Sequence, residues 1–447
     1  MPLKVLIIGA GICGPAMATL LRRSDPETSI TIIERYPELR KNGQQIDLRS
    51  WGVPIIQRMG LLDAIRERTA VESGVAFVNS QGKICGLFGV DKTGTGQQGF
   101  TSEFEIMRGD LSQVLYEASL REPKAPESGD GKTHNGRAQN GSGGDGPGVR
   151  YRFGTWATAM AQDEDGVDVT LSSGGVERYD LVIGADGQGS RTRRMLFGEE
   201  AGQAMFHPLG LYVAYFTVPR EAGDDDIGRL YQPGGGRSVM SRTGKGVRTQ
   251  AYLMIRTRDE AVRRGIEGQP PETQKATFAR LFRGAGWQTE RFLAGMPGAT
   301  DFYAHPVGQV RAPAVALGRV ALLGDAACCA APVTGMGTTV SLITAWTLAG
   351  ELARQRAAGS GGGADVPLAL RAYDASVRPY VVEAQRLIPG VPRLLTLKSR
   401  WAIALFNFVV GIVAFCGLHK LFGRFEAEDK GGLRIPEYPE LKLAPVE

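Results

Sequence analysis

Three glycines near the start of the chain have the spacing of a phosphate-binding turn. Gly9, Gly11 and Gly14 follow an apolar run at residues 4–8 and open a stretch with helical spacing at residues 14–23. The first glycine permits a tight turn, the second lets the backbone approach a pyrophosphate, and the third lets a helix pack closely on a strand. Free N–H groups at the start of that helix attract phosphate. The pattern predicts a dinucleotide-binding site.

An acidic residue stands where a bound dinucleotide would present its ribose. Residues 29–33 are mostly β-branched and predict a second strand, and Glu34 follows them, twenty residues after Gly14. A carboxylate at this place accepts hydrogen bonds from ribose hydroxyls. Strand, helix and strand together predict a Rossmann-type βαβ unit, which by itself does not separate NAD from FAD.

Two later motifs each join a buried strand to an acidic turn. Residues 181–191, LVIGADGQGSR, bring a strand to Asp186, and residues 322–338, LLGDAACCAAPVTGMGT, place Asp325 before a glycine-bearing helix start. The Asp325 carboxylate can accept a hydrogen bond from a ribityl hydroxyl, and backbone N–H groups of the helix start can hold a flavin's carbonyl edge and phosphate side. Taken with the first motif, these two favour FAD over NAD. The backbone N–H groups at this helix start belong to Gly335, Gly337 and Thr338.

The order of these motifs resembles that of the flavoprotein monooxygenases of the para-hydroxybenzoate hydroxylase type. The resemblance extends over residues 3–440 apart from 122–148. Residues 43–49, GQQIDLR, and 107–111, MRGDL, are most similar to the branch that contains tetracycline-inactivating and polyketide-tailoring monooxygenases. The resemblance implies FAD and either NADPH or NADH as cofactors. It also implies insertion of one oxygen atom from dioxygen into an aromatic or polyketide-like small molecule of secondary metabolism.

The resemblance assigns roles to individual residues as well. It implies that Glu34 and Arg35 bind the adenosine part of FAD, and that Asp47 and Arg108 also contact FAD. It further implies that Asp325 holds the ribityl chain. The flavin supplies the redox chemistry in such enzymes, so we expect no catalytic side chain from the protein.

Other assignments depend on turns and strands farther along the chain. The resemblance links the Asp186 turn to both FAD and the nicotinamide cofactor, and family members often have histidine where this chain has Cys328. We expect the substrate on the sheet of the middle segment. Tyr212 and Tyr215 lie on the strand predicted at residues 209–218 and are the candidate substrate contacts, with packed sheet aromatics as the alternative.

The remaining patterns predict an α/β fold with a Rossmann-type FAD-binding domain interleaved with a mainly antiparallel-sheet substrate domain, and a helical C-terminus. A helix is predicted at 53–68, and further strands at 166–171, 179–184, 249–256 and 319–323. Residues 1–187 and 306–356 are assigned to FAD binding, 188–305 to the substrate sheet and 365–447 to the helical C-terminal region. Residues 122–148 are rich in Gly, Ser, Pro, Asn and Asp, and predict a flexible surface insertion.

Composition excludes several functional classes. The net charge is +5 and no run of five Lys or Arg occurs, so nucleic-acid binding is not indicated. The four histidines and five cysteines lack the spacing of a metal site or a disulfide framework, so we expect no metal and a reducing, cytoplasmic environment. The apolar run at residues 4–8 leads into a glycine motif and is expected to be a strand, not a targeting segment.

An uncharged segment near the C-terminus leaves three interpretations open. Residues 401–418 carry no charge, but eighteen residues barely reach across a bilayer. The segment could span a membrane, rest on a membrane or pack on the protein, and we favour a helix that packs or rests rather than spans. For function, the alternatives to a monooxygenase are a flavin-dependent reductase or dehydrogenase on the same fold, and a membrane-docked flavoprotein without catalysis of its own.

Overall fold

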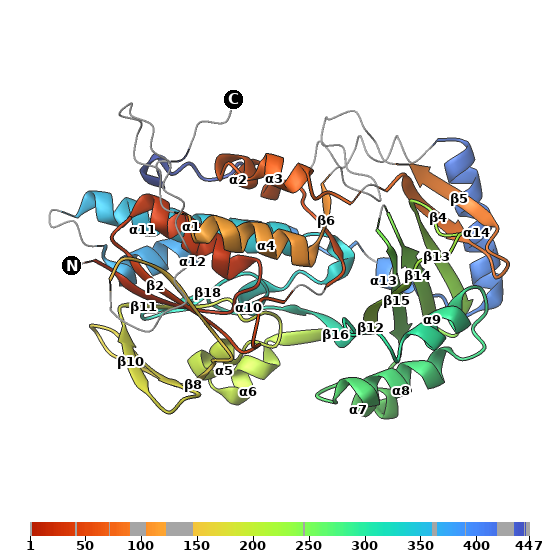
Figure 1. Ribbon diagram of the computed structural model, residues 1–447, viewed down its shortest axis with the longest axis horizontal. Coiled ribbons are helices and arrows are strands. Elements are labelled where there is room, and N and C mark those ends of the chain that lie inside the picture. The colour runs from red at the N-terminus through yellow and green to blue at the C-terminus, as the bar shows by residue number, and fades with distance from the viewer. Residues whose placement is uncertain are drawn as a thin grey trace.

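The computed structural model describes residues 2–40, 43–70, 72–89, 104–121, 146–244, 246–359, 364–388, 390–417, 433–441 and 443. It contains a largely parallel sheet near the N-terminus and a larger sheet at the other end of the elongated molecule (Figure 1). The predicted insertion at 122–148 lies outside the described residues except for its last three. The predicted α/β class is confirmed, with two interleaved parts and a helical C-terminal region.

The first sheet has six strands in the order β17-β18-β11-β1-β2-β7, and all but the edge strand β17 run parallel to their neighbours. The inner strand β1 has apolar side chains on both sides because both faces of the sheet are covered. Val5 and Ile7 pack under helices, while Leu6 and Ile8 pack under a small antiparallel sheet. The strands are β1 (Lys4–Ile8), β2 (Ser29–Glu34), β7 (Gly148–Phe153), β11 (Leu181–Gly184), β17 (Ala316–Leu317) and β18 (Val320–Leu322).

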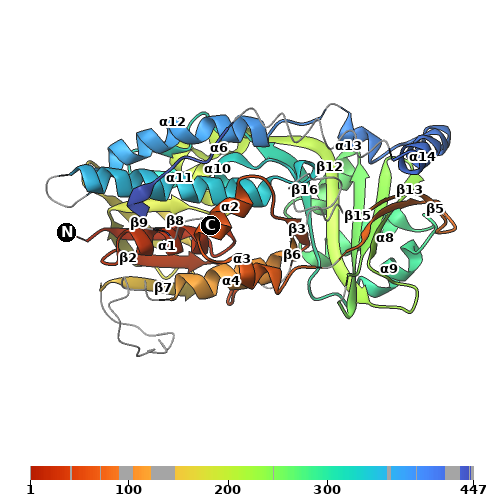
Figure 2. The same ribbon diagram turned by 90° about the horizontal axis from the view of Figure 1, so that it is seen from above.

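Helices cover one face of this sheet, and α11 is the longest of those described (Figure 2). It packs against α1 and α12 and is apolar over much of its circumference, as a helix enclosed on several sides must be. The helices are α1 (Cys13–Ser24), α4 (Arg108–Ser119), α11 (Gly337–Ala358) and α12 (Val366–Ala384). The small sheet on the other face consists of β8 (Ala157–Gln162), β9 (Val167–Leu171) and β10 (Val176–Tyr179).

The second sheet has seven strands in the order β16-β12-β15-β14-β13-β4-β5, antiparallel except for the β13–β4 pair. Helices α7 (Glu260–Ile266), α8 (Pro271–Phe282) and α9 (Thr289–Gly295) cover one face, and α14 (Arg400–Phe415) packs near the β5 edge of the other. The strands are β4 (Gly74–Val78), β5 (Ile84–Gly89), β12 (Phe206–Pro219), β13 (Ile227–Gly234), β14 (Arg237–Arg242), β15 (Arg248–Arg256) and β16 (Tyr303–Val310).

Two expectations need correction. The predicted helix at 53–68 is two helices, α2 (Gly52–Arg58) and α3 (Leu62–Arg66), because the chain turns at Gly60 with a φ of +64°. The expected division also gave residues 1–187 to one part as a whole. Pairing of β4 with β13 instead takes residues 74–89 into the second sheet, a long-range pairing that no local pattern reveals.

Candidate FAD-binding site

The predicted glycine turn joins β1 to α1 and leaves no room for side chains. Gly9 has a φ of +114°, and a Cβ there would lie 2.5 Å from the carbonyl oxygen of Ala185. A Cβ on Gly14 would clash with the carbonyl oxygen of Gly9. The Glu34 carboxylate at the end of β2 accepts a hydrogen bond of 3.0 Å from Ala10 N, inside the turn. Glycine, turn and carboxylate therefore lie together as the sequence predicts.

Arg108 reaches the same turn from a distant part of the sequence. It begins α4 directly after β6 (Glu105–Met107), and its Nη2 atom lies 3.4 Å from the position of a Cβ on Gly11. Burial lowers the pKa of this guanidinium and nearby Arg40 lowers it further, while Asp325 and Glu34 act in the opposite direction. The structure thus brings Arg108 near both predicted carboxylates. A partly buried cation beside a helix N-terminus is suited to a pyrophosphate.

Three polar atoms near these motifs are buried and have no hydrogen-bond partner among the described residues. They are Asp325 Oδ1, Asp47 Oδ1 and Arg49 Nε. Asp47 and Arg49 form an ion pair of 2.8 Å, and a Cβ on Gly335 would lie 3.3 Å from Asp47 Oδ2. Buried polar groups are rarely left without partners, so these atoms indicate a polar ligand. The ribityl hydroxyls and the polar edge of a flavin offer such groups, and the residues fit FAD.

The start of α11 lies beside the segment that carries Asp47 and Arg49. Gly337 is the first residue of the helix, and a Cβ there would meet no described atom within 4 Å. Thr338 is nearly buried in the first turn, whose N–H groups have no intrahelical partner. Thr339 Oγ1 donates a 2.8 Å hydrogen bond to the carbonyl oxygen of Arg49, which ties this helix start to the segment carrying Asp47.

Asp186 and Arg35 are placed differently from the other candidates. The Asp186 carboxylate accepts hydrogen bonds from the backbone N–H groups of Arg191 and Thr192, at 2.8 and 3.0 Å. It therefore satisfies the N-terminus of α5 (Arg191–Phe197), a structural use of the carboxylate that the motif did not reveal. Arg35 is exposed at the surface, where its guanidinium lies 4.9 Å from the ring centroid of Tyr36.

The two candidate substrate tyrosines lie on opposite faces of the second sheet. Tyr212 packs on the face covered by α7 to α9, and its hydroxyl donates a 3.0 Å hydrogen bond to Glu267. Tyr215 lies on the other face, in a cluster with Val333 of the predicted flavin motif. Residues three apart on a strand point to opposite sides, so the pair could not both face one ligand. Tyr212 does not share the face of Tyr215 and Val333, so we do not expect it to contact the substrate.

An aromatic patch surrounds Tyr215. The ring centroids of Tyr303 and Tyr252 lie 5.0 and 4.8 Å from that of Tyr215, and the His305 ring stacks beside them at 5.9 Å. The patch is hydrogen-bonded to the segment before Asp47, because the Tyr303 hydroxyl donates to Gln44. Burial lowers the pKa of His305, so its imidazole is neutral at physiological pH. Sequence reasoning missed Tyr252 and Tyr303, which have no local motif.

A buried ionic cluster lies next to the segment that carries Asp47. Arg242 donates to Glu72 at 2.6 Å and to Glu105, and Gln45 donates to Glu105 as well. Burial raises the pKa of Glu105 to about 8, and the nearby carboxylates of Asp47 and Glu72 raise it, while Arg242 opposes them.

Among the described residues, no group of three or more His, Cys, Asp or Glu side chains could hold a metal ion.

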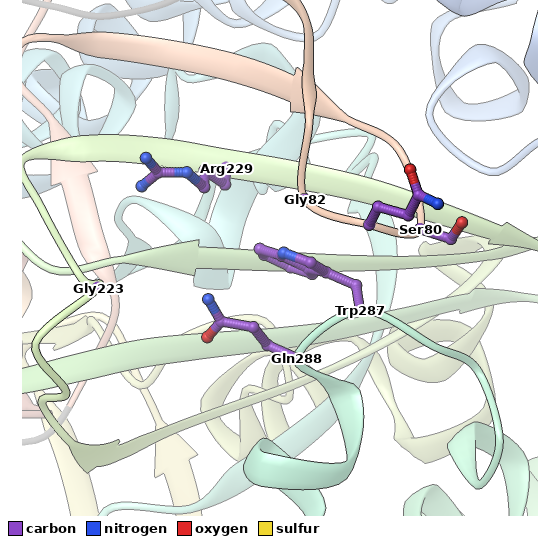
Figure 3. A pocket seen from close by; sticks show the side chains of 7 residues that line it. Ser80, Gly82, Gly223, Arg229, Trp287 and Gln288 are labelled. Carbon is purple, nitrogen blue, oxygen red and sulfur yellow. The ribbon is translucent and has the colours of Figure 1, made fainter.

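The structure also has a cavity that is lined by none of the predicted site residues. Its volume is about 420 Å³, and its lining includes Trp287, Gln288 and Arg229 (Figure 3). Trp287 packs on the α7-to-α9 face of the second sheet, opposite the aromatic patch. This cavity is therefore separate from the candidate FAD site.

Comparison with known proteins gives the family of this chain. A family model described as an FAD binding domain matches residues 142–382. The FAD-dependent monooxygenase asL6 of Sarocladium schorii is 36% identical over 448 residues, covering 99% of this chain and 100% of the relative. The flavin-dependent monooxygenase eupH of Phoma sp is 34% identical and covers 98% of each chain. The crystal structure of tetracycline destructase Tet(51) superposes with a TM-score of 0.73 at 26% identity, covering 98% of this chain and 100% of that one.

Fold and site together define a flavoprotein with one dinucleotide-binding sheet and one aromatic-lined sheet. The chain belongs to the FAD-dependent monooxygenases of the para-hydroxybenzoate hydroxylase type. It is an oxidoreductase, and the predicted class is confirmed. No described helix is both long enough and apolar enough to cross a membrane.

Proposed function

We propose that the protein uses NADPH or NADH to insert one oxygen atom from dioxygen into an aromatic or polyketide-like small molecule of secondary metabolism. The observation that carries this proposal is the contact between the aromatic patch and the candidate FAD site. Gln45 N donates hydrogen bonds to Gln250 Oε1 at 3.0 Å and to the Tyr252 hydroxyl at 3.3 Å, two residues before Asp47. A planar substrate stacked on the patch would lie beside the flavin.

The protein's own residues would hold and orient the two reactants. Glu34 and Arg108 would bind the adenosine ribose and the pyrophosphate, Asp325 the ribityl chain, and the start of α11 the flavin ring. Bound FAD supplies electron transfer and activation of dioxygen. Tyr215, Tyr252 and Tyr303 would present the substrate, and burial raises the pKa of all three hydroxyls, so each keeps its proton.

Aromatic stacking favours a substrate with a wide, flat ring system. Stacked and edge-to-face ring contacts contribute about 0.5–1.5 kcal/mol each beyond area burial. The name of tetracycline destructase Tet(51), which shares 26% identity, also points to a multi-ring substrate for that protein. Both considerations support a polycyclic or phenolic polyketide here.

The decisive experiment follows the oxygen atom. Purified protein would be incubated with NADPH or NADH and a panel of phenolic polyketides under ¹⁸O₂, and products analysed by mass spectrometry. The proposal expects one labelled oxygen atom in the product of at least one phenolic substrate. Oxidised product without label would instead indicate a reductase or dehydrogenase on the same fold. Nicotinamide oxidation that no aromatic compound stimulates would contradict the substrate class.

A further inference from the structure

Helix α14 is fastened to the edge of the second sheet by one face. Phe406 and Val410 pack against Phe77 and Phe88, and the Phe77 and Phe406 ring centroids are 5.3 Å apart. The approach is close, since a Cβ on Gly411 would lie 2.8 Å from the carbonyl oxygen of Cys85 on β5. The helix stands at the end of the molecule farthest from the N-terminus (Figures 1 and 2). Its position is thus fixed by the protein.

The opposite face of α14 exposes a continuous row of large apolar side chains, which we call the outer stripe. Trp401 is 87% exposed, Phe408 67% and Phe415 93%. Residues spaced by three and four lie on one side of a helix, so these side chains form one surface. Scattered apolar residues on a surface need no explanation, but a contiguous row indicates a contact. The outer stripe comprises Trp401, Leu405, Phe408, Ile412 and Phe415.

The charged residues in the described segment that carries the outer stripe have a single sign. Residues 386–417 contain four basic residues and no Asp or Glu. Arg393, Lys398 and Arg400 are exposed next to the start of α14, and Lys83 is exposed in the turn before β5, against which α14 packs. A helix with apolar side chains on one face and flanking cations has the composition of an interfacial helix, which binds anionic lipids through both.

We infer that the outer stripe docks on a lipid surface with anionic headgroups, with α14 lying parallel to that surface. A sixteen-residue helix is about 24 Å long at about 1.5 Å per residue, which is shorter than the roughly 30 Å hydrocarbon core. The helix therefore rests in the interface rather than crossing it. Trp401 has the amphipathic ring that prefers the headgroup level. The inference is independent of the proposed substrate.

The test compares the full-length FAD-loaded protein with two variants by flotation on vesicles. The first replaces Trp401, Phe408 and Phe415 with Ser, and the matched control replaces the exposed Val176 and Val247 with Ser. Because all five side chains are exposed, both variants are expected to fold, which thermal melting and FAD content verify. Vesicles of phosphatidylcholine alone are compared with vesicles containing phosphatidylglycerol, at low and at high salt.

The inference expects wild-type and control proteins to float with the phosphatidylglycerol vesicles, and the bound fraction to fall about tenfold or more in the stripe variant, since binding scales with buried apolar area. High salt should weaken binding. The inference is overturned if the wild type does not float, if the stripe variant floats equally well, or if neutral vesicles serve as well as anionic ones. Sedimentation without lipid is a further test. A wild-type dimer that is absent in the stripe variant would also contradict the inference.

Discussion

At the scale of residues, the site is characterised by polar atoms that the protein buries without satisfying. Asp325 Oδ1, Asp47 Oδ1 and Arg49 Nε have no hydrogen-bond partner among the described residues. Leaving such a group unsatisfied costs about 1–3 kcal/mol, so three of them are a substantial burden on the protein without its cofactor. Cofactor binding should relieve that burden, and FAD should therefore raise the thermal stability of the protein markedly.

Arg108 offers a direct test of the phosphate end of the site. Replacing it with Ala removes a partly buried cation beside Gly11 and should weaken FAD binding by roughly 1.5–3 kcal/mol, about tenfold to a hundredfold in Kd. Fluorescence titration of the protein without FAD measures this. The exposed Arg35, replaced by Ala, is the matched control and should change the Kd far less. Equal effects from both variants would remove Arg108 from the site.

Glu105 should make stability depend on pH in a defined direction. Its folded pKa is raised from 4.5 to about 8, so the folded protein binds a proton that the unfolded chain releases. The stability from this group is present below about pH 4.5 and is lost as the pH rises through 8. Relative to Glu105→Gln, the free energy of unfolding of the wild type should fall between these values, as measured by urea denaturation. Parallel curves for the two proteins would contradict the assignment.

At the scale of elements, Asp186 shows that a carboxylate in a predicted cofactor motif can have a structural use. Its carboxylate accepts the first N–H groups of α5, and losing such an interaction costs about 1 kcal/mol. Asp186→Ala should therefore lower the melting temperature. Its effect on the FAD Kd should be smaller than that of Arg108→Ala. A variant that melts normally but loses FAD would show that Asp186 acts mainly on the cofactor.

Gly14 and Gly337 lie at the starts of α1 and α11, and replacing each with Ala tests the two helix starts. Gly14→Ala forces a Cβ against the Gly9 carbonyl oxygen and should destabilise the β1–α1 packing by roughly 1–3 kcal/mol or more. Gly337→Ala points its Cβ into space without described atoms, so the melting temperature without FAD should be unchanged while FAD binding weakens. Calorimetry and FAD titration separate the two effects. Loss of stability in Gly337→Ala without FAD would mean that the space is not a cofactor site.

At the scale of the whole molecule, local patterns predicted the first sheet better than the second. The motifs around Gly9, Asp186 and Asp325 carry their structure in a few consecutive residues, so their strands and turns were predictable. The pairing of β4 with β13 joins residues about 150 positions apart and has no local signature. The same is true of Tyr303 and Tyr252, which meet Tyr215 only because β16 and β15 flank β12.

The assembly of the site is also a property of the whole chain. Arg108, Asp47 and Gly335 come from three separate segments, and the fold places Gly335 near Asp47 and Arg108 near Asp325. The faces of the second sheet could likewise not be assigned from sequence alone, because alternation along β12 does not say which side meets the FAD-binding part. For this reason Tyr212 and Tyr215 were indistinguishable until the fold was known.

We propose that these distant segments form one FAD site per chain. The most direct measurement denatures the purified protein and compares the absorbance of the released flavin with the concentration of the chain. One FAD site per chain predicts a yellow protein with about one FAD per chain, or a colourless one that takes up one equivalent on reconstitution. A well-folded protein that gains no flavin absorbance in the presence of excess FAD would contradict it.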